Sequence, residues 1–196
     1  MGVLIMSQAT LEKEKIKDAF AIIKDDHKKV KALFDEFEDS DDKEEKLKIA
    51  KEAIKELKMH AVMEEELFYP AVREELDEDE QDMMEEADEE HHVAKVLIAE
   101  LDKMTGKEDH YEAKFTVLSE NIRHHIKEEE GDMLPEAKKT DIDFKVLGEQ
   151  MWELKQRLLS DGVPPDAEAE MVKKGGLRGD SPAKNAQKKI NVPLKQ

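Results

Sequence analysis

The chain has 196 residues and a net charge of -18, with 42% charged and 38% hydrophobic residues. The negative charge argues against a general nucleic-acid binder and against a protein that coats anionic membranes. Because there is no cysteine, disulfide scaffolds, iron–sulfur clusters and thiol nucleophiles are excluded. Aromatic residues make up only 5% of the chain, and the composition as a whole favours an all-α protein.

No apolar run approaches the roughly 20 residues that a membrane-spanning helix needs. The apolar stretch from Met1 to Met6 is too short for a secretory signal peptide and has no small-residue cleavage site after it. We therefore expect a soluble protein located in the cytoplasm.

Apolar residues recur at alternating steps of three and four along four segments, which predicts four amphipathic helices facing one core. These segments run from Phe20 to Phe37, from Ala50 to Leu67, from Met84 to Leu101 and from Phe115 to Glu129. Short polar or glycine-containing segments connect them. Short connections between long helices predict an antiparallel, up-down-up-down four-helix bundle.

A fifth pattern, from Phe144 to Leu158, predicts a short helix that lies against the bundle. Beyond about Ser160 the periodicity ends, and proline and glycine become frequent. We expect an N-terminal extension over residues 1–14, a bundle domain over 15–159 and a flexible tail over 160–196. The tail is basic near its end. Either it folds back loosely on the acidic body or stays disordered, or it docks on a protein partner or a nucleic acid.

One histidine lies on the apolar face of each predicted bundle helix, where a hydrophobic residue is expected. These histidines are His27, His60, His91 and His125. Two of them are followed four residues later by a glutamate, Glu64 and Glu129. Residues four apart lie on one helical face, with Cβ atoms about 5–6 Å apart. The pattern therefore predicts that six metal-binding side chains meet in one layer of the core.

Burial of four imidazoles and two carboxylates without a cation would cost several kcal/mol per charged group. A carboxylate can also bridge two cations through its two oxygens. We interpret the six side chains as a two-metal site, whose mixed nitrogen and oxygen donors suit iron, with manganese or zinc less suited. The alternative interpretation is a set of core histidines and solvated His–Glu pairs.

The chain repeats itself with an offset of 64 or 65 residues. The segment Asp26–Lys31 aligns with Glu90–Lys95, and His60–Pro70 aligns with His125–Pro135. Each repeat supplies two histidines and one glutamate, which predicts two helical hairpins related by a pseudo-twofold axis. Prolines at equivalent places in the two repeats are expected to kink their helices one to two turns after the glutamates.

At three of the predicted ligand positions, an adjacent residue of the same type is an alternative ligand. His92, His124 and Glu130 each lie beside a chosen residue and remain alternatives to it. Glu65, like Glu130, is expected to be mostly solvated. His110 is remote from the predicted layer, and we expect it at the surface.

These residues resemble the hemerythrin-like, HHE cation-binding family. The motifs that carry the resemblance are Asp26-His27, His60-x-x-x-Glu64-Glu65 running to Phe68-Tyr69-Pro70, Glu90-His91 with Ala94-Lys95, and His124-His125-x-x-x-Glu129-Glu130 running to Pro135. The resemblance implies a four-helix bundle with a non-haem diiron centre, which binds oxygen or responds to iron or redox state.

The chain departs from the oxygen-carrying hemerythrins at one position. Those proteins place two ligand histidines four residues apart on the third helix, whereas Lys95 follows His91 here. The missing nitrogen ligand argues against a dedicated oxygen carrier. Three alternatives remain for the coordination position of the missing histidine. Water fills it, a second carboxylate fills it, or it stays open until a substrate binds.

Two ferrous ions with two carboxylates keep about two positive charges, which favours a small diatomic or anionic ligand. We therefore expect a diiron protein that binds oxygen or a related small oxidant or anion, or that senses or handles iron and redox stress, and we do not expect an enzyme. One alternative is an oxidoreductase that reduces peroxide or nitric oxide. Another is an iron-responsive interaction module that acts through the basic tail.

Overall fold

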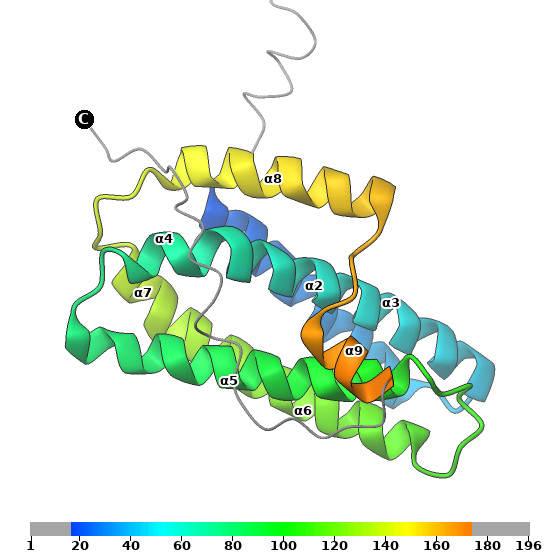
Figure 1. Ribbon diagram of the computed structural model, residues 1–196. Coiled ribbons are helices and arrows are strands. Elements are labelled where there is room, and N and C mark those ends of the chain that lie inside the picture. Colours follow the sequence, from blue (N-terminus) through cyan, green and yellow to red (C-terminus); the bar gives the residue numbers. More distant parts are fainter. Residues whose placement is uncertain (1–16, 174–196) are drawn as a thin grey trace, which may run out of the picture.

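The computed structural model describes residues 17–173, and these residues are predominantly helical (Figure 1). The predicted all-α class is therefore confirmed. The expected N-terminal extension, residues 1–14, and the last part of the expected tail, residues 174–196, lie outside the described residues. Within residues 17–173, no helix combines the length and apolarity that crossing a membrane requires. The cytoplasmic location stays a prediction.

Four long helices build the bundle: α2 (Ala19–Asp39), α3 (Lys43–Met63), α5 (Glu78–Leu101) and α6 (Tyr111–Glu128). Helix α2 packs along α3, and α5 packs along α6, so that two hairpins face each other (Figure 1). Aspartates begin the first hairpin's helices, since Asp18 accepts a hydrogen bond from the Ala21 N–H and Asp42 accepts one from the Glu45 N–H. The predicted up-down-up-down arrangement is confirmed.

The kinks expected at Pro70 and Pro135 take the form of widened, π-helical turns. Helix α3 continues through η1 (Glu64–Phe68) into α4 (Tyr69–Arg73), and α6 continues through η2 (Glu129–Met133) into α7 (Leu134–Ala137). Each proline is the second residue of its short helix. Because proline has no N–H and its ring clashes with the carbonyl four residues earlier, the preceding turn widens to i→i+5 hydrogen bonds.

The predicted fifth helix is α8 (Phe144–Asp161), which has 18 residues and is therefore not short. It lies along α2, α3 and η1 on one side of the bundle (Figure 1). The contact with the start of α2 is so close that a Cβ atom on Gly148 would lie 2.5 Å from the Lys17 carbonyl oxygen. Glycine at this position lets the two backbones approach each other.

The segment after Ser160 differs from the expected flexible tail in its first part. Helix α8 continues to Asp161, and a further helix, α9 (Ala167–Lys173), packs against α5. The Asp166 carboxylate caps α9 by accepting a hydrogen bond from the Ala169 N–H. Only Glu168 of α9 is fully buried, so this helix has no apolar face that periodicity could detect.

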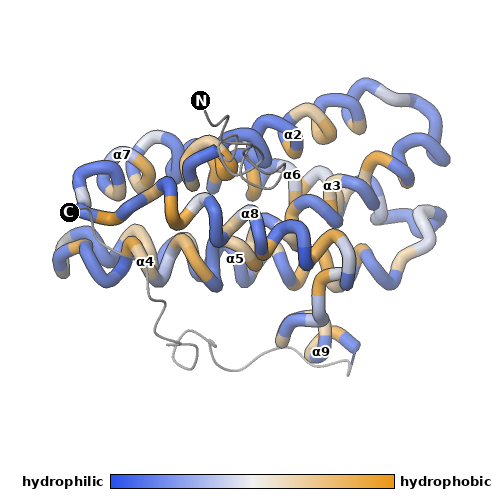
Figure 2. The backbone as a smooth tube through the Cα atoms, turned by 90° about the horizontal axis from the view of Figure 1, so that it is seen from above, coloured by the Kyte–Doolittle hydropathy of each residue, from blue (hydrophilic) through white to orange (hydrophobic). Residues whose placement is uncertain are grey.

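Two apolar clusters fill the interior, and on α2 and α5 the buried histidine lies between the residues of one cluster and those of the other. On α3 and α6 the histidine lies close to the place where residues of one cluster give way to those of the other. One cluster gathers around α4, α7 and α8, and the other lies at the opposite ends of the four long helices. Figure 2 shows the apolar residues interspersed with polar ones along every helix. The buried polar layer is therefore enclosed by hydrophobic packing above and below.

Candidate metal centre

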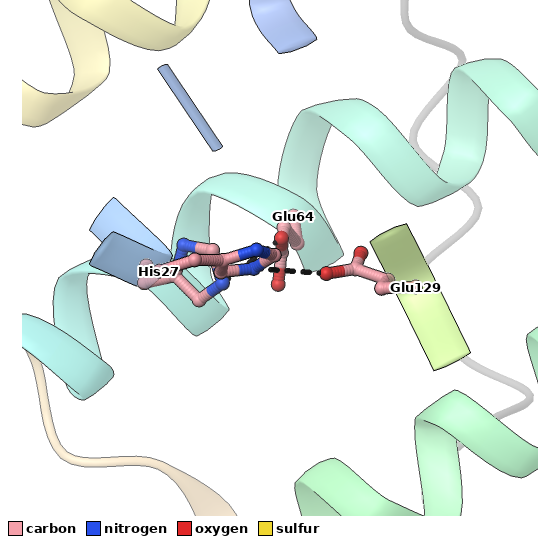
Figure 3. Close-up of side chains that lie close together, drawn as sticks. His27, Glu64 and Glu129 are labelled. Carbon is pink, nitrogen blue, oxygen red and sulfur yellow. Dashed lines mark ion pairs between the residues drawn. The ribbon is translucent and has the colours of Figure 1, made fainter. Parts of the chain in front are cut away.

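The structure brings the six predicted site residues together in one buried layer. Their exposed fractions are 5% or less: His27 1%, His60 5%, Glu64 0%, His91 4%, His125 2% and Glu129 1%. Each bundle helix supplies one histidine, and the first residues of the two π-turns supply the glutamates. Figure 3 shows His27, Glu64 and Glu129 pointing toward one another.

A first cluster holds His27, His60, Glu64 and Glu129, which offer ligand atoms within 4.8 Å of one another. Nε2 of His27 lies 3.0 Å from Oε2 of Glu129, and Nε2 of His60 lies 3.0 Å from Oε1 of Glu64. Two imidazole nitrogens and two carboxylate oxygens therefore surround one point.

A second cluster holds Glu64, His91 and His125, again with ligand atoms within 4.8 Å of one another. The two imidazole Nε2 atoms lie 3.2 Å apart, and Nε2 of His91 lies 3.5 Å from Oε2 of Glu64. Glu64 therefore belongs to both clusters, with one oxygen toward His60 and the other toward His91. A carboxylate in this place can bridge two cations.

The outer nitrogen of one histidine in each repeat contacts a carboxylate of the other repeat. Nδ1 of His27 lies 3.0 Å from Glu130, and Nδ1 of His91 lies 2.9 Å from Glu65. Both glutamates directly follow a glutamate of the cluster, and their side chains are about 30% exposed. The expectation that they are mostly solvated is therefore wrong, because each orients an imidazole.

The other two histidines contact a carboxylate that precedes a histidine. Nδ1 of His60 lies 3.9 Å from Asp26, and Nδ1 of His125 lies 2.7 Å from Glu90. All four imidazoles thus turn Nδ1 toward an acid and Nε2 inward. Nδ1 of His27, His91 and His125 lies within hydrogen-bond distance of its carboxylate, whereas Nδ1 of His60 is too far from Asp26 for a hydrogen bond. Such outer carboxylates fix the tautomer and the ring orientation of histidines that ligate metals.

The inward nitrogen and oxygen atoms are arranged to bind a cation and not to form hydrogen bonds with one another. Nε2 of His27 and His60, Oε1 of Glu64 and Oε2 of Glu129 are buried and make no hydrogen bond within the described residues. They nevertheless lie 3.0 Å apart in pairs. Atoms that approach so closely without hydrogen-bonding geometry converge on a common point, which is the arrangement that a metal ion satisfies.

Tyr69 is a functional candidate that the sequence analysis missed. Its buried hydroxyl lies 3.4 Å from Nε2 of His91, 3.5 Å from Nε2 of His125 and 3.2 Å from Oε1 of Glu129. It also lies 3.5 Å from Oε2 of Glu64. The phenol therefore lies among the three residues of the second cluster and also contacts Glu129 of the first.

The π-turn η1 is what directs Tyr69 into the layer. In an α-helix, residues five apart point about 140° away from each other. Here the Tyr69 N–H donates to the Glu64 carbonyl, five residues earlier, so both side chains share a face. The equivalent residue of the second repeat is Leu134, so the second repeat offers no phenol to the layer.

The neighbouring histidines lie outside the two clusters. His92 pairs with Glu168 of α9 at 2.8 Å, and His124 is 58% exposed and lies 3.1 Å from Glu128. His110 is exposed at the start of α6, as expected.

The comparisons with known proteins agree with this geometry. A model of the hemerythrin HHE cation-binding domain matches residues 18–137. The chain belongs to the hemerythrin HHE cation-binding family. A solved structure of an HHE cation-binding domain-containing protein from Mycobacterium kansasii is similar in fold, with a TM-score of 0.59 and 23% sequence identity. That match covers 78% of this chain and 97% of the other. No curated protein matches.

Membership makes this HHE protein a metal-binding protein with a helical bundle. The buried imidazoles and carboxylates of the layer shift one another's pKa values. Burial alone would lower the pKa of His60, but the carboxylates of Glu64 and Asp26 raise it to about 10. Burial would raise the pKa of Glu129, but His27 and the other imidazoles lower it to about 2. The raised pKa values of His60 and His125 favour protonated imidazoles at these two positions, where they offset the buried carboxylates.

We expect the metal-free HHE protein to lose stability as the pH rises from about 6.5 to about 10. Because the pKa of His60 in the folded state exceeds its ordinary value of 6.5, the stabilisation is complete below that value and is lost as the pH approaches 10. Thermal unfolding of metal-free protein across this range measures the effect, on the order of a few kcal/mol. A His60→Asn variant should show a flatter profile, and equal slopes in both proteins would contradict the assignment.

Proposed function

We propose that the chain is a non-haem diiron protein whose ligands are His27, His60, Glu64, His91, His125 and Glu129. The observation that carries this proposal is Glu64, whose two oxygens face two separate clusters of imidazoles. One ion would lie between His27, His60, Glu64 and Glu129, and the other between Glu64, His91 and His125. The mixture of nitrogen and oxygen donors favours iron over manganese or zinc.

We further propose that Tyr69 is a ligand of the second ion. Three ligand atoms of the second cluster and one oxygen of Glu129 lie within 3.5 Å of its hydroxyl oxygen, which is the spacing of atoms around one metal. Without metal, burial and the charges of Glu129 and Glu64 raise the pKa of Tyr69, so the phenol keeps its proton and donates a hydrogen bond to Glu129. Two adjacent cations would offset those carboxylates and favour the phenolate.

The proposed role is to bind a small oxidant or anion, and so to sense or handle iron and redox stress. Two ferrous ions, two carboxylates and one phenolate leave about one positive charge in a buried layer, which attracts such ligands. Bound iron supplies open coordination positions and one-electron redox chemistry. The oxygen ligand Tyr69, in the place of a nitrogen ligand, separates this centre from that of a dedicated oxygen carrier.

A second candidate is the reduction of peroxide or nitric oxide, which consumes protons. If Tyr69 keeps its proton instead of binding the second ion as a phenolate, its hydroxyl, 3.2 Å from Glu129, is a proton donor inside the layer and favours this candidate. Action through the basic tail stays a prediction, because most of the tail lies outside the described residues.

Titration of the iron-loaded protein with azide, oxygen, peroxide and nitric oxide tests the proposal. We expect azide and at least one of the oxidants to change the near-ultraviolet and visible bands in proportion to the amount bound. In a Glu64→Gln variant the response should fall with the metal content. Bands that none of these ligands perturbs would contradict a ligand-binding role.

A further inference from the structure

A cavity of about 400 Å³ lies beside the metal layer, and all four layer histidines line it. Its volume is within the range of about 300–1,000 Å³ that small-molecule sites occupy. The walls away from the histidines are largely apolar and come from all four bundle helices: Val30, Leu57, Ala94, Ile98, Ile122 and Ile126. This chamber is much larger than a diatomic ligand needs, since one water molecule takes up about 30 Å³ in the liquid.

Charged residues also line the chamber, and two of its carboxylates pair with lysines, while the acidic residues Glu66 and Asp166 line it as well. Lys58 of α3 pairs with Asp102, the residue after α5, and Lys95 of α5 pairs with Glu65 in η1. Lys95 stands where the oxygen carriers have their second histidine on this helix. Its ammonium group contacts Glu65, which also orients His91.

The connection between α8 and α9 covers the chamber. Val163, Pro164, Pro165 and Asp166 line it together with Ala169 of α9. Helix α9 is held on α5 by the contact of Glu168 with His92 and by a hydrogen bond from Lys103 to the Val172 carbonyl. Figure 1 shows this connection leaving α8 and ending in α9 beside α5. The covering segment makes the walls more apolar and restricts solvent.

We propose that the chamber binds a small organic anion with an apolar body, such as a medium-chain carboxylate, with its anionic group at the metal layer. This inference rests on the proposed diiron function. The metal pair keeps a net positive charge at one end, which suits the anionic group. The apolar walls favour hydrocarbon over water at the other end. A polar ligand without an apolar body would leave those walls in contact with trapped water.

Calorimetric titration of the iron-loaded protein with acetate, butanoate, hexanoate and octanoate tests this inference. We expect the affinity to rise about fourfold for each methylene group that is buried, until the chamber is full. Equal affinities for acetate and hexanoate would overturn the proposal. The azide response of the same preparation reports on the metal centre separately. If azide binds and chain length has no effect, the diiron proposal stands and the chamber proposal fails.

Two variants fill the chamber from opposite walls. Ala61→Phe places a ring on the partly exposed α3 wall, and Ala169→Phe places one on the covering helix. Each should weaken hexanoate binding at least tenfold while iron content and azide binding stay near wild type. Ala113→Phe, an exposed position of α6 outside the chamber, is the matched control and should bind hexanoate normally. Unchanged hexanoate binding in both folded chamber variants would overturn the proposal.

Discussion

Replacing His60 or His125 by alanine is expected to remove most of the bound metal and to lower the thermal stability of the loaded protein. Each histidine supplies an inward nitrogen to a different cluster, and both clusters share Glu64. Loss of one ion therefore also changes the charge balance around Glu64, which is a ligand of the other ion as well. A ligand present at about 100 times its dissociation constant stabilises by about 2.7 kcal/mol. At this chain length, that corresponds to roughly 5–10 °C in the midpoint of unfolding.

Elemental analysis of the purified variants, together with thermal unfolding, measures both effects. His110→Ala is the control, because His110 is exposed at the start of α6 and belongs to neither cluster. It should keep the wild-type metal content and midpoint. Equal metal content in the His60 and His110 variants would contradict the proposed ligand set.

The Tyr69→Phe substitution is expected to have the second-largest effect. A phenolate bound to ferric iron gives a visible charge-transfer band, and the variant should lose that band completely. It should also retain less of the second ion, since the ligands of the first cluster do not include the phenol. The ring itself remains, so the packing of the buried side chain is largely preserved.

Visible spectra and iron content of the oxidised proteins measure this prediction. Tyr111→Phe is a matched control, because Tyr111 is equally buried but packs in the apolar cluster away from the metal layer. That variant should keep the wild-type colour. A Tyr69→Phe protein with the wild-type visible band would show that the phenol does not coordinate iron.

The helical bundle was predictable from the sequence because helical periodicity is a local signal. The His–Glu pairs four residues apart, repeated after 64 or 65 residues, predicted a common layer, and the structure places all six side chains there. Adjacent residues of a helix point in different directions, so the apolar pattern indicates which histidine of each doublet faces the core. It selected His91 over His92 and His125 over His124, and both selected side chains are buried. Whether these side chains hold iron is not a matter of periodicity and stays a proposal.

What the sequence analysis missed depends on geometry that is not local. Tyr69 reaches the layer only because Pro70 is preceded by a π-turn, whereas regular helical geometry would point it away from Glu64. The contacts of Glu65 with His91 and of Glu130 with His27 join separate repeats, so no spacing along the chain reports them. The chamber was missed for the same reason, since its walls come from four helices and the segment before α9.

The central claim is that one chain holds two iron ions bridged by Glu64. The most direct test is the iron content of tagless protein, made in iron-supplemented cells and purified without chelator, together with its absorption spectrum. The account predicts about two iron ions per chain and near-ultraviolet bands of a carboxylate-bridged pair, which bleach on reduction. One ion per chain would contradict the bridging role of Glu64. A folded helical protein without metal would mean that the four histidines are core residues.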